Sequence, residues 1–287
     1  MYAVVGATGN TGREVVRELK GLNEKPICVV RNPSKAKEVL GADTNTAIAE
    51  LDDRAGLERA LAGSKRVFIV TGHNPKSAEQ QINVIDAAKA VGAEYIVKVS
   101  GGRAVTGPNV ESVNGRAHYQ IEEHLKTCGL RWCILSPGLF MQNMLGQAAN
   151  IKGGKIVQPW PKDLPVALID VRDTGGLGAR VLRDPGKHAG KIYSFTGAAT
   201  TYGAFSNVIA EVLGKPISYE PITLEQAEQG MKARGLPDWL VAHFIAMARA
   251  GAAGAFSKES TQPIRDIVGR APITTRQFVQ DYKAAFS

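Results

Sequence analysis

Over its first 135 residues the chain alternates short β-branched runs with segments of helical spacing, and this alternation limits the possible folds more than any other feature. The runs are Tyr2–Val5, Ile27–Val30, Thr46–Leu51, Val67–Val70, Tyr95–Val99 and Arg131–Leu135. Strands that alternate with helices imply right-handed βαβ units and a parallel sheet covered on both faces. The runs are almost continuously apolar, as burial on both faces requires. The sequence therefore predicts an α/β fold with a doubly wound parallel sheet.

Chemical signals mark the ends of the predicted helices. Asn32-Pro33 supplies an N-cap followed by proline at the first helical position, and Gly41 closes that helix. Asp53 is expected to cap a further helix that stops at Gly63.

After about residue 136 the alternation breaks. We predict a Gly- and Pro-rich loop over 153–165, then a strand and helix over 166–183 with Asp173 as the cap. Further elements are expected near Lys191–Phe195, Tyr202–Leu213, Ile217–Pro221, Thr223, Trp239 and Thr274. We therefore divide the chain into a main domain, 1–152 with 166–183 returning to it, and a smaller α+β lobe, 153–165 and 184–287.

Composition excludes some classes of protein. No apolar run reaches the roughly 18–20 residues needed to span a bilayer, and Met1–Val5 reaches Gly6 too soon for a signal-peptide core. We therefore predict a cytoplasmic protein without a membrane partner. The three cysteines, Cys28, Cys128 and Cys133, lie in or beside apolar stretches without metal-type spacing. We interpret them as buried reduced thiols, and we predict no metal.

The charge balance allows an anionic ligand. Lys plus Arg number 35 and Asp plus Glu 27, which gives a net charge of +8. The basic residues are scattered along the chain, and there is no helix-turn-helix or zinc motif, so we predict no direct nucleic-acid partner. A ligand that carries phosphate needs only two or three of these residues.

A glycine cluster, Gly6-Ala-Thr-Gly9-Asn-Thr-Gly12, follows the first strand and opens the first helix. Free amides and the positive end of the helix dipole attract a phosphate there. Glycine is needed because a side chain would block the backbone from a pyrophosphate or crowd the contact between strand and helix. The pattern predicts a Rossmann-type dinucleotide site in which Gly6, Thr8, Gly9, Asn10, Thr11 and Gly12 contact the cofactor. The alternative is an ordinary tight turn.

The end of the second strand indicates which dinucleotide binds. A site that prefers NAD places Asp or Glu there to bind the ribose hydroxyl, but this chain has Arg31. A guanidinium suits a 2′-phosphate, and Lys35 adds a second charge one helical turn later, with Arg13 also within reach. We therefore predict NADP(H) as the cofactor of residues 1–152; a solvated surface arginine is the alternative.

The glycine spacing and the terminal lobe resemble the extended short-chain dehydrogenase/reductase superfamily. That resemblance implies a catalytic Tyr-x-x-x-Lys pair on the helix after the fifth strand. None of the seven tyrosines has lysine four residues later, and Asn114 and His118 stand in the expected positions. A standard alcohol dehydrogenase, and an epimerase that holds NAD, are therefore disfavoured.

Other motifs resemble the NmrA-like atypical short-chain reductases over nearly the whole chain. They are Gly6–Gly12, Val30–Pro33, the His118…Glu122 helix, Leu135–Asn143, Ile169–Asp173, Gly190–Thr196 and Tyr202. The resemblance implies either an NADPH-dependent reductase of quinones, triphenylmethane dyes, imines or enones, or a catalytically silent sensor that binds the dinucleotide and a protein partner. Ser136 departs from the pattern, because many members carry Arg before this Pro-Gly.

The missing Tyr-Lys pair limits the acceptor. Reduction of a simple ketone makes a basic alkoxide that needs a positioned acid. Quinones, conjugated enones and iminium or triarylmethyl cations give better stabilised products, so holding the acceptor flat supplies most of the catalysis. We therefore predict an NADPH-dependent reductase of a planar, electron-poor small molecule, with the NADP(H) sensor as the alternative. The oligomeric state stays open, and a homodimer is one choice.

Ligands of parallel sheets lie outside the carboxyl ends of the strands. On this basis we expect further cofactor contacts from Asp52, Thr71, Gly72, His73, Ser100, Gly101 and Pro137. For Asp52, helix capping is an equal interpretation. We expect substrate contacts from Gly138, Phe140, Met141, Asn143 and Trp160, with core packing as the rival for Phe140 and Met141.

The helix after the fifth strand supplies the candidate catalytic residue. His118 is expected to orient the nicotinamide ribose or relay a proton, unless it is a surface histidine paired with Glu122. The polar segment Gly101–Gly115 is expected to be a mobile lid.

Overall fold

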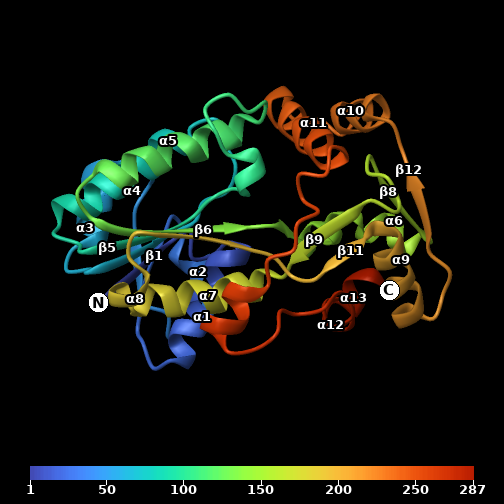
Figure 1. Cartoon of the computed structure of the whole chain (residues 1–287). Coiled ribbons are helices and arrows are strands. Elements are labelled where there is room, and N and C mark those ends of the chain that lie inside the picture. Colours follow the sequence, from blue (N-terminus) through green and yellow to red (C-terminus); the bar gives the residue numbers. More distant parts are fainter.

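A computed structural model describes residues 1–287 and contains a seven-stranded parallel sheet with two small sheets beside it (Figure 1). The large sheet has the order β10-β6-β5-β4-β1-β2-β3. Its strands are β1 Tyr2–Val5, β2 Ile27–Val30, β3 Thr46–Ile48, β4 Arg66–Ile69, β5 Tyr95–Val99, β6 Arg131–Pro137 and β10 Lys191–Phe195. The order reverses between β1 and β4, and crevices at such switch points hold the ligands of doubly wound sheets. The predicted fold class is confirmed.

Helices cover both faces of this sheet, and the strands are apolar on both sides for that reason. In β1, Val4 packs into the core under the helices of one face, whereas Ala3 and Val5 pack into the core under the other. The first face carries α1 Asn10–Gly21, α2 Pro33–Leu40 and α7 Val171–Arg183. The second carries α3 Arg54–Leu61, α4 Ser77–Ala90 and α5 Val113–Thr127.

Most of the predicted helix caps are present. Asn32 Oδ1 accepts a hydrogen bond from the Lys35 amide at 3.0 Å, with Pro33 at the first helical position. Asp53 caps α3 by accepting from the Gly56 amide at 2.9 Å. Thr223 and Thr274 form complete capping boxes at α10 Leu224–Ala233 and α12 Thr275–Asp281.

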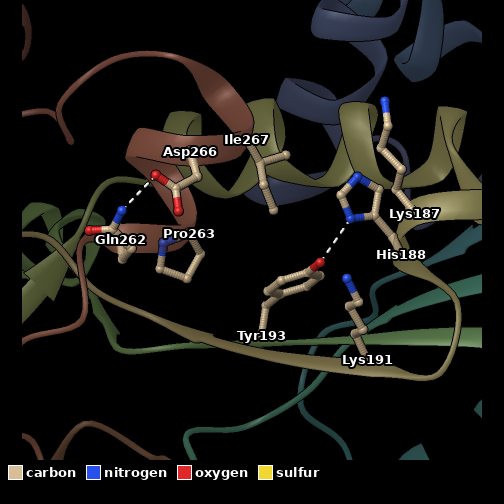
Figure 2. Close-up of a pocket in the computed structure, with 8 residues that line it drawn as sticks. All are labelled: Lys187, His188, Lys191, Tyr193, Gln262, Pro263, Asp266 and Ile267. Carbon is tan, nitrogen blue, oxygen red and sulfur yellow. Dashed lines mark hydrogen bonds between the residues drawn. The ribbon is translucent and has the colours of Figure 1, made fainter.

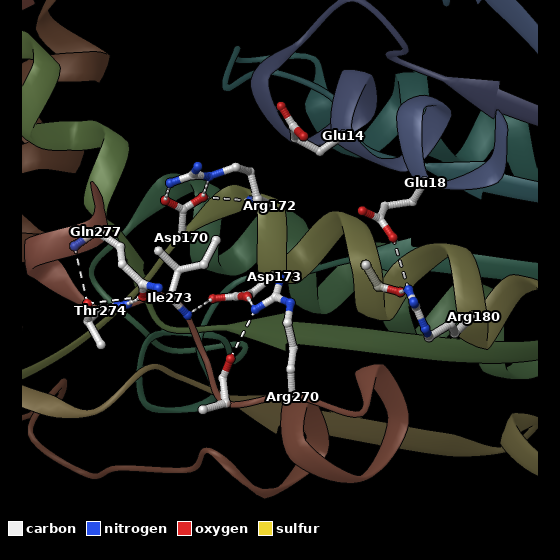
Figure 3. A network of polar contacts seen from close by, with 12 residues as sticks. Glu14, Glu18, Asp170, Arg172, Asp173, Arg180, Arg270, Ile273, Thr274 and Gln277 are labelled. Atoms are coloured by element: carbon white, nitrogen blue, oxygen red, sulfur yellow. Dashed lines mark hydrogen bonds and ion pairs between the residues drawn. The ribbon is translucent and has the colours of Figure 1, made fainter. Parts of the chain in front are cut away.

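The prediction that Asp173 caps a helix is wrong. Asp170 caps α7 instead, by accepting from the Arg172 amide at 2.8 Å. Asp173 lies inside the first turn, fully buried, where its carboxylate accepts hydrogen bonds from the Arg270 guanidinium and from the Ile273 amide (Figure 3). These bonds attach the C-terminal segment to α7.

The smaller lobe lies beyond the carboxyl ends of the large sheet (Figure 1). A three-stranded sheet contains β7 Leu139–Phe140, β9 Pro165–Ile169 and β11 Ala199–Thr201, and β8 Lys155–Gln158 pairs with β12 Ser218–Pro221. Besides α10 and α12, the remaining helical elements are η1 Arg103–Val105, η2 Met141–Gln147, α6 Ala148–Lys152, α8 Pro185–His188, α9 Tyr202–Leu213, α11 Asp238–Ala252, η3 Ile264–Val268 and α13 Lys283–Phe286.

Three segments differ from the predicted organisation. The expected loop over 153–165 contains β8, because an apolar pair at Ile156 and Val157 finds a parallel partner in β12. Strand β10, which the predicted division placed in the smaller lobe, pairs with β6 at the edge of the large sheet. Helix α7 packs closely against α1, while β9 before it belongs to the small sheet.

The three cysteines are free and buried, as predicted. Burial raises the pKa of the Cys28 thiol to about 11, so it stays protonated. No helix combines the length and the apolar character needed to cross a membrane.

Candidate active site

The turn between β1 and α1 excludes side chains at two of its glycines. Gly6 has φ +81°, and a Cβ there would lie 1.7 Å from the Val70 carbonyl oxygen. A Cβ on Gly12 would lie 2.1 Å from the Gly6 carbonyl oxygen. Gly9 is the N-cap of α1, and no side chain caps this helix. The turn therefore leaves the first amides of α1 for an anion, and it fits the pyrophosphate of a dinucleotide.

The polar residues of this turn differ in exposure. Asn10 is exposed, Thr8 is half-buried and Thr11 is buried. Their backbones open helix α1, where an anion would meet both the amides and the positive end of the dipole.

Two basic side chains lie free near the end of β2. Arg31 and Lys35 are both exposed, and neither side chain forms a hydrogen bond or salt bridge within the protein. Arg13, by contrast, has its Nε 3.6 Å from the Glu14 carboxylate. Arg31 and Lys35 are therefore available for a phosphate beside the glycine turn, as the sequence predicts for NADP(H).

The loops after β3 and β4 hold the next predicted residues. Asp52 accepts hydrogen bonds from Gln80 Nε2 at 3.2 and 3.3 Å, and it does not cap α3, so the capping interpretation is wrong for this residue. Thr71 Oγ1 accepts from Gln81 Nε2 at 2.8 Å. Gly72 faces open space, because a Cβ there would meet nothing within 4 Å.

A buried polar cluster follows β5. The Glu122 carboxylate, on α5, accepts hydrogen bonds from the Ser100 hydroxyl and from both terminal nitrogens of Arg103, one of them at 2.8 Å. Arg103 Nε also donates to Ser136 Oγ at 3.0 Å, and Ser136 donates to the Gly101 carbonyl at 2.6 Å. Many members of the family that the sequence resembles have arginine at the position of Ser136. In this chain the guanidinium at that place comes from Arg103, which donates to Ser136. Glu122 binds this guanidinium, so the alternative interpretation of His118, as a surface histidine paired with Glu122, is wrong.

His118 contacts a lysine that the sequence analysis did not single out. Lys98 lies on β5 and is fully buried; its Nζ is 3.0 Å from His118 Nδ1 and 3.1 Å from the Val99 carbonyl oxygen. The other edge of the His118 ring lies near Gly101, where a Cβ would be 3.1 Å from Cδ2. The signal in the sequence was a lysine inside the otherwise apolar central run Tyr95–Val99.

Burial and charge shift the pKa values of this cluster. Burial lowers the pKa of Lys98 to about 7, against the pull of the Glu122 charge. The pKa of His118 lies well below its usual value because of burial and the nearby Lys98 charge, so the ring is neutral. Burial alone would raise the pKa of Glu122, but hydrogen bonds from Arg103 and Ser100 lower it overall.

The segment after β6 contains most of the residues that were predicted to contact the acceptor. Pro137 ends β6, and the Gly138 amide donates to the Phe195 carbonyl at 2.9 Å. A Cβ on Gly138 would lie 2.8 Å from the Ala167 carbonyl oxygen. Phe140 is partly buried and Asn143 is exposed, whereas Met141 is buried in the core of the lobe. The core-packing alternative thus describes Met141.

Trp160 also packs within the lobe. Its ring lies against Gly251 of α11, where a Cβ would be 1.6 Å from the ring, and between Tyr202 and Phe256 at centroid distances of 5.7 and 5.8 Å. The Tyr219 hydroxyl donates to the Trp160 carbonyl at 2.8 Å. These contacts show that Trp160 packs against α11 and holds this helix in place. The sequence analysis predicted a substrate contact for Trp160 and did not predict this packing.

Helix α11 joins the lobe to the loops around the site. The His243 ring makes an edge-on contact with the His73 ring, with centroids 4.8 Å apart, and His243 Nδ1 is 2.9 Å from Ser112 Oγ. Arg249 pairs with Glu111 on the same segment. The expected lid 101–115 is therefore attached to α11 at its far end and to Glu122 through Arg103 at its near end. His73 was predicted as a cofactor contact; its partner His243 was not identified from the sequence.

A separate cavity of about 620 Å³ lies between β10, α8 and η3 (Figure 2). Lys191 starts β10, so this cavity lies toward the amino-terminal side of that strand, away from the carboxyl ends that carry the residues above. Four of its lining residues are Lys187, His188, Tyr193 and Asp266, and His188 Nδ1 is 2.8 Å from the Tyr193 hydroxyl. None of its lining residues was predicted as a site residue.

Comparison with known proteins agrees with this geometry. The model of the NmrA-like family matches residues 2–268. The NAD(P)H azoreductase of Xenophilus azovorans is 32% identical over 288 residues, which are 100% of this chain and 99% of that protein. The (4-alkanoyl-5-oxo-2,5-dihydrofuran-3-yl)methyl phosphate reductase of Streptomyces griseus is 30% identical over 289 residues, 100% and 99% of the two chains. The NADPH-dependent quinone oxidoreductase of Escherichia coli, solved in complex with NADPH, has a TM-score of 0.87 at 26% identity and covers 99% of this chain and 100% of that one. The chain thus belongs to the NmrA-like family.

Proposed function

We propose that this protein is an NAD(P)H-dependent reductase that transfers hydride to a planar, electron-poor organic acceptor, quinone-like by preference. The observation that carries the proposal is the side-chain-free turn of Gly6 and Gly12 with unpaired Arg31 beside it. The turn suits a pyrophosphate, and the free guanidinium suits the additional phosphate of NADP(H). The relatives that span the whole chain are named as an NAD(P)H azoreductase and an NADPH-dependent quinone oxidoreductase.

In this proposal, the dinucleotide lies across the carboxyl ends of the strands. The amides of Asn10, Thr11 and Gly12 hold the pyrophosphate, while the Gly9 amide closes the turn by donating to the Gly6 carbonyl at 3.1 Å. Arg31 and Lys35 hold the 2′-phosphate. The bound nicotinamide supplies the hydride. Asp52, the Thr71–His73 loop, Ser100, Gly101 and Pro137 are the proposed contacts along the rest of the cofactor.

The proposed acceptor class follows from the acids that the site does and does not contain. No tyrosine stands four residues before a lysine, so the usual donor to an alkoxide is missing. His118 is the proposed proton donor, since it lies beside Gly101 with a neutral ring. Quinones and enones need less acid assistance during hydride transfer than simple ketones, because delocalisation stabilises their products, whereas the nitrogen of a reduced azo group must be protonated. Each of these three types occurs among the acceptors that the relatives' names describe. Gly138, Phe140 and Asn143 are the proposed acceptor contacts.

The test measures cofactor binding and turnover separately. Titration with NADPH and NADH, followed by nicotinamide fluorescence, is expected to show tighter binding of NADPH. NADPH oxidation is then followed with a panel of quinones, an azo dye, a conjugated enone and a simple ketone, and the simple ketone is expected to be the poorest substrate. Tight NADPH binding without turnover of any acceptor would favour the sensor over the reductase. Equal affinity for the two dinucleotides would contradict the proposed role of Arg31.

A further inference from the structure

The strongest feature that this function leaves unexplained is the fully buried ammonium of Lys98. Burying a charge is costly unless polar partners compensate for it. Lys98 Nζ has two partners within hydrogen-bond distance, the Val99 carbonyl oxygen at 3.1 Å and His118 Nδ1 at 3.0 Å, and it forms no salt bridge. A lysine without a structural ion pair in this position calls for another explanation.

Chemistry determines the direction of the contact between Lys98 and His118. An ammonium has three donors and no lone pair, so Lys98 donates and His118 Nδ1 accepts. A neutral imidazole carries one proton, which must then be on Nε2. His118 Nε2 has no hydrogen-bond partner in the protein, and the adjoining Cδ2 edge faces Gly101, at the end of β5.

We propose that Lys98 is a positioning residue that sets the Nε2–H tautomer of His118 and replaces the proton which His118 gives to the reduced acceptor. The inference rests on the proposed reductase function and adds a residue to it. Lys98 reaches the acceptor only through His118.

The protons and electrons balance as follows. Hydride brings two electrons and one proton to the acceptor and leaves the dinucleotide oxidised, so an acceptor oxygen or nitrogen gains an electron pair. That atom forms a bond to the proton of His118 Nε2. His118 Nδ1 takes a proton from Lys98 Nζ, so the histidine ends neutral with its proton on Nδ1, and the lysine ends as a neutral amine. One proton from water restores the ammonium, and the histidine then returns to its first tautomer.

The charged groups around the pair support this proton transfer. The groups that act on Lys98 and His118 are Glu122 on α5, Arg103 on η1, His73 after β4 and His243 on α11. Burial brings the pKa of Lys98 to about 7, where an ammonium can both lose and regain a proton at neutral pH. Glu122 is occupied by Arg103 and Ser100, so its carboxylate balances the charge of the cluster without itself contacting Lys98.

The first test is spectroscopic and needs no turnover. The protein contains five histidines, so ¹⁵N-histidine labelling with long-range ¹H–¹⁵N spectra can resolve each ring, with His118→Gln to assign its signals. We expect the His118 ring of the wild type to be neutral at pH 6 with its proton on Nε2. Lys98→Met should change the ratio of the two tautomers, whereas Lys89→Met, an exposed lysine on α4, should not. A wild-type ring protonated on Nδ1 would overturn the inference.

The second test is kinetic and uses the same variants. Lys98→Met should lower kcat for an azo dye, whose reduced nitrogen must be protonated, by about 100-fold, a typical contribution of general acid catalysis. It should lower kcat for a quinone much less, and it should leave the affinity for NADPH within a few-fold of the wild type. Methionine has a similar volume, and replacing a buried charge by an apolar residue often preserves the fold. In the wild type, kcat should fall as pH rises through about 7. Lys98→Arg should keep the Nε2–H tautomer of His118 but leave kcat for the azo dye low at every pH, because arginine does not give up the proton that His118 needs.

The outcomes separate the inference from the proposed function. If the wild-type protein neither binds nor oxidises NADPH, the proposed reductase function is wrong, and the proposed proton supply from Lys98 to His118 is wrong with it. A wild type that turns over, combined with unchanged tautomers or unchanged kcat for the azo dye in Lys98→Met, overturns the proton supply alone. If Lys98→Met does not fold, the wild-type tautomer and pH profile still decide the question.

Discussion

The glycine turn after β1 and the polar cluster after β5 lie at the same edge of one sheet, yet they are built in opposite ways. The turn is made of backbone from seven consecutive residues, and its geometry depends on missing side chains at Gly6 and Gly12. The cluster is made of side chains from β5, η1, α5 and β6, and Lys98, Arg103 and Glu122 depend on one another for charge compensation.

The two regions should respond differently to pH and to substitution. A backbone cradle has no titratable group, so its affinity for an anion should change little with pH. A cluster of coupled charges can store and move protons, and it should respond to pH and to the loss of any member. Variants of the turn should therefore change cofactor binding, whereas variants of the cluster and of the segment that covers it should change the pH dependence.

The largest expected effect comes from Gly12→Val. Its Cβ would lie 2.1 Å from the Gly6 carbonyl oxygen, so the turn must open and lose the amides that face the pyrophosphate. We expect NADPH affinity to fall about 1000-fold, which is roughly 4 kcal/mol for the loss of two charge-assisted hydrogen bonds. Fluorescence titration measures the change. Gly21→Ala, where a Cβ meets nothing within 4 Å, is the matched control on the same helix.

His243 should make stability depend on pH. Burial, with a contribution from His73, lowers its pKa to about 4 in the folded protein. The unfolded chain then takes up a proton first as pH falls, so stability drops between the unfolded value of 6.5 and about 4. The expected contribution is about 3 kcal/mol over this window. Urea unfolding at several pH values should show a shallower slope for His243→Gln than for the wild type, and equal slopes would contradict the assignment.

Glu122→Gln should destabilise the cluster without greatly weakening cofactor binding. It leaves the Arg103 guanidinium uncompensated, and we expect a loss of about 2 kcal/mol at pH 7, below the range for a fully buried pair because Arg103 is partly exposed. The folded pKa of Glu122 is lowered, so its contribution is present above the ordinary value of 4.5 and disappears as pH falls below it. Urea unfolding at pH 7 and pH 4 tests this, with the exposed Glu123→Gln as control. A deficit that does not shrink on acidification would disprove the ion pair.

The smallest expected effect is that of Arg31→Ala on cofactor choice. Losing one charge-assisted contact to a 2′-phosphate should weaken NADPH binding about tenfold, roughly 1.4 kcal/mol, and leave NADH binding unchanged. Lys37→Ala, an exposed lysine on α2, the helix that follows Arg31, should change neither affinity. If Arg31→Ala weakens both dinucleotides equally, the guanidinium does not select the phosphate.

The fold was largely predictable because its signals are local. Strands β1, β2, β5 and β10 have the predicted bounds, and so does α9. Asn32 and Asp53 cap helices as expected, since a cap depends on a few neighbouring residues. Asp173 was misassigned because Asp170, three residues earlier, offers the same chemistry, and only the arrival of Arg270 shows why Asp173 is buried.

The site was predictable only in part, for a related reason. The glycine turn is contiguous, so its spacing revealed it. The Lys98–His118 contact spans 20 residues, and the His73–His243 contact joins the loop after β4 to a helix of the other lobe. The residues next to Lys98 and His243 in the sequence do not indicate which distant residues these side chains contact. Trp160 was expected near a ligand because of its loop, but Gly251 provides a space on α11 that the ring fills.

We could predict the parallel sheet, the glycine turn and the position of a guanidinium after β2 from local signals, because periodicity, glycine spacing and caps act over one or two turns of chain. Three contacts appear only in the folded protein. The buried Lys98 contacts His118, the Glu122 carboxylate binds the Arg103 guanidinium, and His243 of α11 packs against His73. These contacts depend on how strands stack side by side and where the lobe docks. Burial and charge compensation, which set the protonation of the site, exist only after that packing is complete.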